Sequence, residues 1–235
     1  MITRSLPPAA VLAGGLGTRI RAVGGSTPKV LLPVEGRPFI GHLLDVLIRQ
    51  GVSRAVLCLG HAADAVWDAA QTEAGDAIEL VASRESEPLG TGGALRNALP
   101  HLPGIFFALN GDTLLDAPLA ELLEQHRARG AALTLSLVRS HREAEKGSVR
   151  MAPDGTVLRF DEKIEDGTGL INAGVYVMDA GVIPPGAGPV SLEREIIPAA
   201  LERGDAVTAR IVDAPFVDIG LPEDYLAVRN RLPRR

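Results

Sequence analysis

A glycine-rich turn near the start of the chain has the composition of a phosphate-binding loop. The apolar run of residues 9–13 leads into the turn of residues 14–17, and Arg19 follows. Glycines let backbone N–H groups converge on a phosphate, and an arginine adds a planar charged donor. The dinucleotide-binding fingerprint lacks its third glycine because position 20 is Ile20, and the Lys-Ser/Thr ending of a P-loop is missing. An ordinary turn between a strand and a helix, with a solvated arginine, is the alternative.

Three further charged residues have types and positions suited to phosphate chemistry. Lys29 lies in a stiff segment between two prolines, Asp112 follows the apolar run of residues 105–109, and Asp218 follows a second short apolar run. Magnesium is typically held by one or two carboxylates together with phosphate oxygens and water, so the two aspartates are candidate ligands. The alternatives are a surface lysine, a turn residue at Asp112 and a helix cap at Asp218.

Strand and helix patterns alternate through the first half of the chain and predict the scaffold for these residues. Short apolar runs predict strands and a period of 3.6 residues predicts helices. The predicted strands cover residues 9–13, 55–59, 78–82, 105–109 and 133–138, and the predicted helices cover 38–50, 62–74, 91–99 and 119–126. Strands that are apolar on both faces indicate a parallel sheet covered by helices on both sides, which binds ligands at the carboxyl ends of its strands.

The second half of the chain has a different pattern. Residues 148–151 and 157–160 flank the turn Pro153-Asp154-Gly155, which predicts a hairpin. Further strands are expected at residues 170–178 and 207–212, and helices at 193–202 and 222–232. We interpret this half as a small β lid over the nucleotide-binding half, within one continuous domain of residues 1–235 that divides near residue 140.

Composition limits the function classes. The 235 residues carry a formal net charge of -5 with dispersed basic residues, so no nucleic-acid-binding surface is expected. No apolar run reaches the length of a membrane span, no secretion signal is apparent, and the single cysteine excludes a disulfide framework. The five histidines show no metal-binding spacing. We expect a cytoplasmic monomer or homodimer that acts on small molecules.

In order along the chain, several segments resemble the motifs of sugar-1-phosphate nucleotidylyltransferases. They are LAGGLGTR at residues 12–19, TPKVLLPV at 27–34, EPLGTGGAL at 87–95, NGDT at 110–113, EK at 162–163, NAGVY at 172–176, SLERE at 191–195 and VDIG at 217–220. The D-glycero-D-manno-heptose 1-phosphate guanylyltransferases are the most similar branch, with mannose-1-phosphate guanylyltransferases nearby.

The resemblance implies a Rossmann-like α/β fold of the nucleotidyltransferase and glycosyltransferase-A type, and it implies roles for individual residues. The implied nucleotide-binding residues are Leu12, Ala13, Gly14, Gly15, Gly17, Thr18, Arg19, Lys29, Glu87, Gly92 and Gly111. The implied sugar-phosphate-binding residues are Gly147, Glu162, Lys163, Asn172 and Glu193. Asp112 and Asp218 would bind Mg²⁺, and Arg19, Lys29, Asp112 and Lys163 would be catalytic.

Some of these residues have structural alternatives. Glu193 suits the first turn of a helix, Lys163 could pair with Glu165, and Asn172 could be a buried strand amide. The chain also departs from the family where residues 20–26 replace a common Leu-Arg-Pro-Leu-Thr stretch and Lys146 replaces a common tyrosine.

The implied activity joins a nucleoside monophosphate from an NTP to a sugar 1-phosphate and releases pyrophosphate. GTP is the expected nucleotide, because the N1–H and 2-amino donors of guanine suit a carboxylate such as Glu87, although backbone carbonyls could accept the same hydrogen bonds. A heptose or related manno-sugar is the expected acceptor, for a glycan precursor. The alternatives are a uridylyl- or thymidylyltransferase, a glycosyltransferase and a non-catalytic homologue that binds nucleotide sugars.

Overall fold

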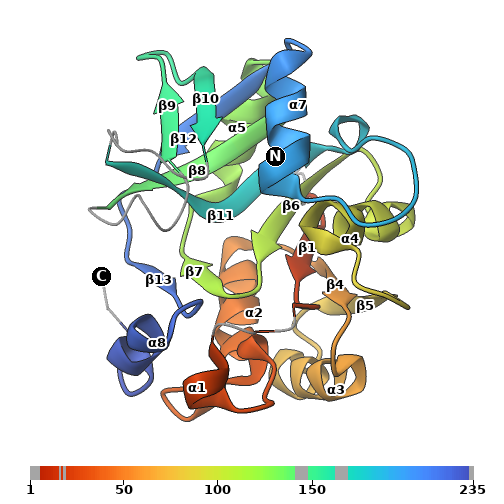
Figure 1. The fold of residues 1–235 in the computed structure, drawn as a ribbon, viewed down its shortest axis with the longest axis vertical. Coiled ribbons are helices and arrows are strands. Elements are labelled where there is room, and N and C mark those ends of the chain that lie inside the picture. Colours follow the sequence, from red (N-terminus) through yellow and green to blue (C-terminus); the bar gives the residue numbers. More distant parts are fainter. Residues whose placement is uncertain (1–5, 16, 18–19, 141–147, 162–168, 233–235) are drawn as a thin grey trace.

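The computed structural model describes residues 6–15, 17, 20–140, 148–161 and 169–232. Over the first half of the chain, the predicted alternation of strands and helices is confirmed (Figure 1). The strands of this half in the main sheet are β1 (Ala9–Leu12), β4 (Arg54–Leu59), β5 (Glu79–Arg84), β6 (Ile105–Asn110) and β8 (Leu133–Arg139). The helices are α1 (Arg21–Gly24), α2 (Phe39–Gln50), α3 (Ala63–Ala74), α4 (Gly90–Ala98) and α5 (Leu119–Ala128), with 3₁₀ turns at η2 (Lys29–Leu31) and η3 (Leu99–His101).

The second half supplies the remaining strands and helices. They are β9 (Ser148–Met151), β10 (Val157–Asp161), β11 (Leu170–Asp179), η4 (Ala180–Val182), η5 (Leu192–Ile196), α7 (Ile197–Glu202), β12 (Val207–Ile211), β13 (Phe216–Asp218) and α8 (Pro222–Val228). The hairpin β9–β10 is as predicted. The helix expected at residues 193–202 instead begins with a π-helical turn, η5, and the last helix is shorter than expected because it ends at Val228.

One nine-stranded sheet runs through the molecule, and most of its first-half strands are parallel. Strand β11 lies between β6 and β8 and is antiparallel to both, while β12 pairs in parallel with β8. Thus residues 170–178, which we interpreted as part of a lid, lie inside the sheet. The pairing of β11 with β8 is interrupted between Asn172 and Tyr176, where Gly174 has φ 72°. That left-handed conformation suits glycine, and the bulge re-aims the side chains at the end of the strand.

Both faces of the sheet are buried, which explains the continuous apolar runs. Alternate residues of β6 point to opposite faces: Phe107 and Leu109 pack with α2, α3 and α5, and Phe106 and Ala108 pack with α4 and α7. Tyr176 of β11 is fully buried on the α4 and α7 face. The sheet therefore holds the carboxyl ends of β1 and β6 rigidly side by side.

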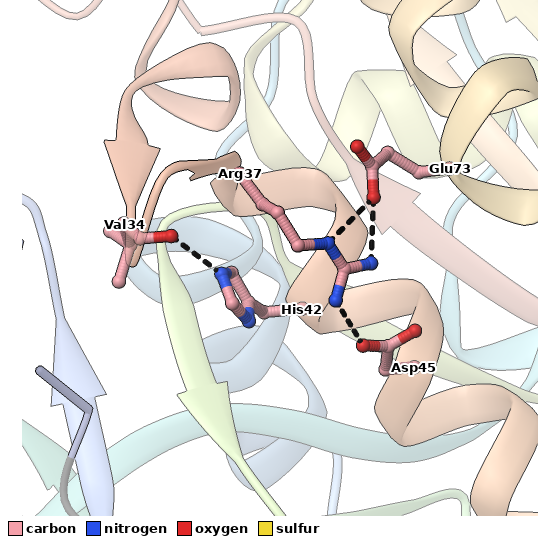
Figure 2. A network of polar contacts seen from close by, with 5 residues as sticks. All are labelled: Val34, Arg37, His42, Asp45 and Glu73. Carbon is pink, nitrogen blue, oxygen red and sulfur yellow. Dashed lines mark hydrogen bonds and ion pairs between the residues drawn. The ribbon is translucent and has the colours of Figure 1, made fainter.

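Two further sheets, each of two strands, lie outside the main sheet. Strands β2 (Pro33–Val34) and β3 (Arg37–Pro38) form a hairpin directly after Lys29, and β7 (Thr113–Leu115) pairs with β13. Figure 2 shows how the hairpin is fixed: the Arg37 guanidinium donates to Asp45 Oδ2 of α2 at 2.9 Å and to Glu73 Oε2 of α3 at 2.6 Å. His42 Nε2 lies 2.9 Å from the Val34 carbonyl oxygen in the same view (Figure 2).

Candidate active site

A cleft of about 630 Å³ opens at the carboxyl ends of β1 and β6. It brings together most of the described residues that the sequence singled out. Those that line it are Leu12, Ala13, Gly14, Gly15, Gly17, Lys29, Gly111, Asp112, Asn172, Glu193 and Asp218. Thr18, Arg19, Gly147, Glu162 and Lys163 lie outside the described residues, so their predicted roles stay predictions.

Close approach between backbones explains the glycines at the floor of the cleft. A Cβ atom on Gly14 would lie 2.9 Å from the Gly60 nitrogen, and one on Gly111 would lie 2.3 Å from the Leu12 carbonyl oxygen. The Gly111 N–H donates to that same oxygen at 3.1 Å. A side chain at either position would push the loop after β1 away from β4 or β6, and Gly17 additionally has φ 59°. Gly14, Gly15 and Gly17 therefore line the cleft without side chains.

Lys29 and Asp112 meet across 83 residues of sequence. The Lys29 ammonium donates to Asp112 Oδ2 at 2.9 Å, with the lysine side chain only 13% exposed and the aspartate 31% exposed. Lys29 is the first residue of η2, which precedes the β2–β3 hairpin along the chain, and Asp112 lies in the turn between β6 and β7. The pairing places one cation and one anion where the glycine turn ends.

Asp218 reaches the same end of the cleft through the small β7–β13 sheet. The register pairs Asp218 with Thr113, and the Ile219 N–H donates to the Asp112 carbonyl oxygen at 2.9 Å. A Cβ atom on Gly220 would lie 2.7 Å from Asp218 Oδ1 and 3.7 Å from Asp112 Oδ2, so both carboxylates border one small space.

These two carboxylates fit a magnesium ion that takes its other ligands from phosphate and water. No group of three or more His, Cys, Asp or Glu residues with metal-binding geometry occurs in the described part of the chain. A site formed by protein side chains alone is therefore not found there, whereas a site shared with a triphosphate needs no third protein ligand.

Asn172 and Glu193 also line the cleft. The Asn172 amide donates to the Tyr176 hydroxyl at 2.5 Å, and its oxygen accepts from the Gly174 N–H at 3.2 Å. Burial raises the pKa of the Tyr176 phenol well above its ordinary value, so this group stays a neutral hydroxyl that holds the amide. The Glu193 carboxylate accepts from the Thr91 hydroxyl at 2.7 Å.

A further carboxylate in the cleft belongs to Glu85. Glu85 lines the cleft beside Gly14, and its Oε2 accepts from the Leu89 N–H at 2.9 Å. Burial raises the pKa of its carboxyl, an effect that the hydrogen bond from Leu89 opposes. Glu87, the sequence candidate for base recognition, is exposed and does not line the cleft.

Gly92 is also absent from the lining, because it faces the protein interior. Its N–H donates to the Val190 carbonyl oxygen at 2.9 Å, and a Cβ atom there would lie 2.5 Å from Ile196 Cδ1.

Sequence reasoning missed Glu85, Thr91 and Tyr176. Thr91 and Tyr176 lie inside the motifs that carry the resemblance, so their polar groups were a usable signal. Glu85 precedes its motif by two residues, and no local pattern singled it out.

Comparison with known protein families assigns the chain to one of them. The sequence model described as nucleotidyl transferase matches residues 9–235, nearly the whole chain. The chain belongs to the nucleotidyl transferase family. This confirms the resemblance drawn from the motifs, and with it the expectation of a mostly parallel sheet covered by helices.

Individual family members are similar over almost the whole chain. The chain is 40% identical over 227 residues to a mannose-1-phosphate guanylyltransferase of Mycobacterium tuberculosis, covering 93% of this chain and 62% of the relative. It is 30% identical over 217 residues to a D-glycero-alpha-D-manno-heptose 1-phosphate guanylyltransferase of Campylobacter jejuni, covering 92% and 96%. The chain thus spans about three fifths of the length of the mannose relative and nearly all of the heptose relative.

A solved structure agrees with the fold in detail. The crystal structure of HddC from Yersinia pseudotuberculosis complexed with GMP-PN superposes with a TM-score of 0.83 at 32% identity, covering 95% of this chain and 98% of that one.

No helix in the described part of the chain is long and apolar enough to span a lipid bilayer.

Proposed function

We propose that this chain transfers a guanylyl group from GTP to a sugar 1-phosphate and releases pyrophosphate. The observation that carries the proposal is the convergence of the glycine turn, Lys29, Asp112 and Asp218 in one cleft that Asn172 and Glu193 also line. Two polyanionic substrates repel each other, so an enzyme that joins them needs positive charge and fixed positions far more than a protein nucleophile. The similarity to guanylyltransferases of mannose 1-phosphate and heptose 1-phosphate supports this reading.

The proposed reaction is an in-line displacement. An oxygen of the sugar phosphate forms a bond to the α-phosphorus, the bond from that phosphorus to the bridging oxygen of the β-phosphate breaks, and pyrophosphate leaves with the electron pair. Lys29 would bind the triphosphate as a point charge, and the backbone of the turn at residues 14–17 would hold its oxygens. Asp112 and Asp218 would hold Mg²⁺, which supplies charge neutralisation and orientation of the phosphates when bound. Arg19 and Lys163 are proposed to complete the contacts to the triphosphate and the sugar phosphate.

Guanine recognition by Glu85 is the finer part of the proposal. Guanine offers two donors side by side, N1–H and the 2-amino group, which a carboxylate accepts well. Glu85 meets that need better than Glu87, because it lines the cleft and Glu87 does not. Its raised pKa means that the charged carboxylate is poorly solvated, and a ligand with two donors would relieve this.

We propose a manno-sugar 1-phosphate as the acceptor, because guanylyltransferases of mannose 1-phosphate and of manno-heptose 1-phosphate are both similar to this chain. Because an NTP is a substrate, the cytoplasm is the proposed location.

The test is pyrophosphate release from a panel of GTP, UTP, dTTP and CTP crossed with mannose, manno-heptose and glucose 1-phosphates. We expect GTP with a manno-sugar to be turned over best, and Asp112→Asn to lose most of this activity. Glu85→Gln should lower the preference for GTP over UTP about ten- to hundredfold, by analogy with bidentate base readout. Glu87→Gln is the matched control and should leave the preference unchanged. A wild type that prefers UTP, dTTP or CTP would refute the guanylyl assignment, and one that releases no pyrophosphate would refute the activity.

A further inference from the structure

Two segments about a hundred residues apart form one rigid wall of the cleft. The N–H groups of Gly92 and Gly93, in the first turn of α4, both donate to the Val190 carbonyl oxygen, at 2.9 and 3.0 Å. The Val190 N–H in turn donates to the Leu89 carbonyl oxygen at 2.9 Å. Gly90 has φ 71°, and a Cβ atom there would lie 2.7 Å from the Val190 oxygen. Backbone therefore packs on backbone, and neither segment can shift without the other.

The Thr91 hydroxyl sits at this junction and joins it to Glu193. It donates to Glu193 Oε2 at 2.7 Å and accepts from the Leu192 N–H at 2.8 Å. Because one N–H donates to it, the hydroxyl is turned so that its own hydrogen points at the carboxylate. Ser191 Oγ donates to the same Oε2 at 3.3 Å. Both of these hydrogen bonds end on Oε2, and Glu193 lines the cleft.

The local backbone also favours a role for Glu193 beyond that of an acidic residue in the first turn of a helix. It lies in the π-helical turn η5, which Ser191 caps by accepting from the Arg194 N–H at 3.2 Å. A π-helical turn inserts one extra residue and occurs frequently at functional sites. Here it leaves both Glu193 and Arg194 on the cleft wall.

We propose that Thr91, in the first turn of α4, is a positioning residue that fixes the Glu193 carboxylate for the sugar hydroxyl groups and thereby sets sugar selectivity. This inference rests on the proposed function, because it needs a sugar phosphate in the cleft. A carboxylate that rotates freely accepts hydrogen bonds from hydroxyls in many arrangements, whereas one held by two hydroxyls discriminates between epimers. Selectivity of this kind comes from orientation, and not from an additional contact with the sugar.

The experiment compares Thr91→Val, which keeps the shape and removes the hydroxyl, with Thr91→Ser, which keeps the hydroxyl. For Thr91→Val we expect kcat/KM for the best sugar 1-phosphate to fall about tenfold, the effect of losing one hydrogen bond to a charged group. The ratio of kcat/KM between mannose and glucose 1-phosphates should fall by a similar factor. The GTP affinity of Thr91→Val, measured by calorimetry, should stay within about twofold of the wild-type value, which also shows that the nucleotide site is intact. Thr91→Ser should restore the wild-type ratio of kcat/KM between the two sugar phosphates. Thr72→Val, at an exposed threonine of α3 that donates to the Asp68 carbonyl oxygen, controls for the substitution itself.

A second background separates positioning from a structural role. In Glu193→Ala the proposed partner is absent, so adding Thr91→Val should change kcat/KM for the sugar phosphate by less than about twofold. An undiminished tenfold effect in that background would overturn the proposal, as would an active wild type whose sugar selectivity survives Thr91→Val. A wild type that releases no pyrophosphate from any pair of substrates would instead overturn the proposed function, and this inference with it.

Discussion

The ion pair between Lys29 and Asp112 leads to a prediction in which metal binding and catalysis change in opposite directions. In the substrate-free protein the Lys29 ammonium lies 2.9 Å from the Asp112 oxygen that we propose as a metal ligand. A divalent cation must displace this ammonium or share the carboxylate with it. Lys29→Met keeps the apolar stem and removes the charge, so the nucleotide-free variant should bind a divalent cation more tightly. The same variant should lose turnover, because the triphosphate loses its ammonium.

The structure bounds the size of both effects. Unit charges about 4 Å apart attract by about 4 kcal/mol at an effective dielectric constant of 20. Asp112 is 31% exposed, so water screens much of this attraction, and measured pairs at partly exposed positions are worth less. A net effect of about 1–2 kcal/mol corresponds to metal affinity that is about tenfold higher. Removing one charge-stabilising donor from an active site typically lowers kcat by about a hundredfold or more.

Manganese binding to the nucleotide-free protein, followed by electron paramagnetic resonance, measures the first effect, and pyrophosphate release measures the second. Asp218→Asn is the matched variant, since it leaves the Lys29–Asp112 pair intact and removes the other carboxylate; it should weaken manganese binding. Unchanged or weaker manganese binding in Lys29→Met would refute competition for Asp112. Near-normal turnover in Lys29→Met would remove Lys29 from the triphosphate site.

Three further predictions concern groups around the cleft. Tyr176→Phe should raise KM for the sugar phosphate about tenfold while KM for the nucleotide stays unchanged, because the Asn172 amide loses the hydroxyl that holds it; equal effects on both substrates would contradict this. Arg37→Met should lower the free energy of unfolding, measured with urea, by about 1–2 kcal/mol, since it leaves the largely buried Glu73 unpaired, and no loss would show that the network in Figure 2 is neutral. Burial lowers the pKa of His126, which packs against Thr134, so the unfolded chain binds the proton more readily and stability should fall as the pH drops below about 6.5. Urea unfolding at pH 7.5 and 5.5 should show a smaller loss for His126→Asn than for the wild type, and equal losses would exclude His126 as the cause.

The sequence alone determined the order of strands and helices in the first half and the positions of the motifs at the strand ends. These features depend on local sterics and on burial, which leave a periodic trace in the residues. Asp112, for example, was identifiable because it follows an apolar run and a turn-forming Asn-Gly pair. The glycine turn was identifiable for the same reason.

Only the tertiary structure decided how β11 enters the sheet and which acid faces the cleft. The largely apolar segment of residues 170–178 suits a strand in any register, and long-range pairing with β6 and β8 determines that the strand is central and antiparallel. Glu85 and Glu87 are alike in sequence terms. Glu85 faces the cleft because its own N–H continues the β5 pairing by donating to the Leu59 carbonyl oxygen, at 2.8 Å, and its carboxylate accepts from Leu89.

Contacts between distant residues had no local trace at all. Lys29 and Asp112 are 83 residues apart, and Thr91 and Glu193 are 102 residues apart. Each pair forms because separate segments pack on one sheet, and the direction of a polar side chain in a loop depends on which partner the fold brings within reach. The residue types were visible in the sequence, whereas their partners followed from packing, since a hydrogen bond between side chains depends on distance in space and not on spacing along the chain.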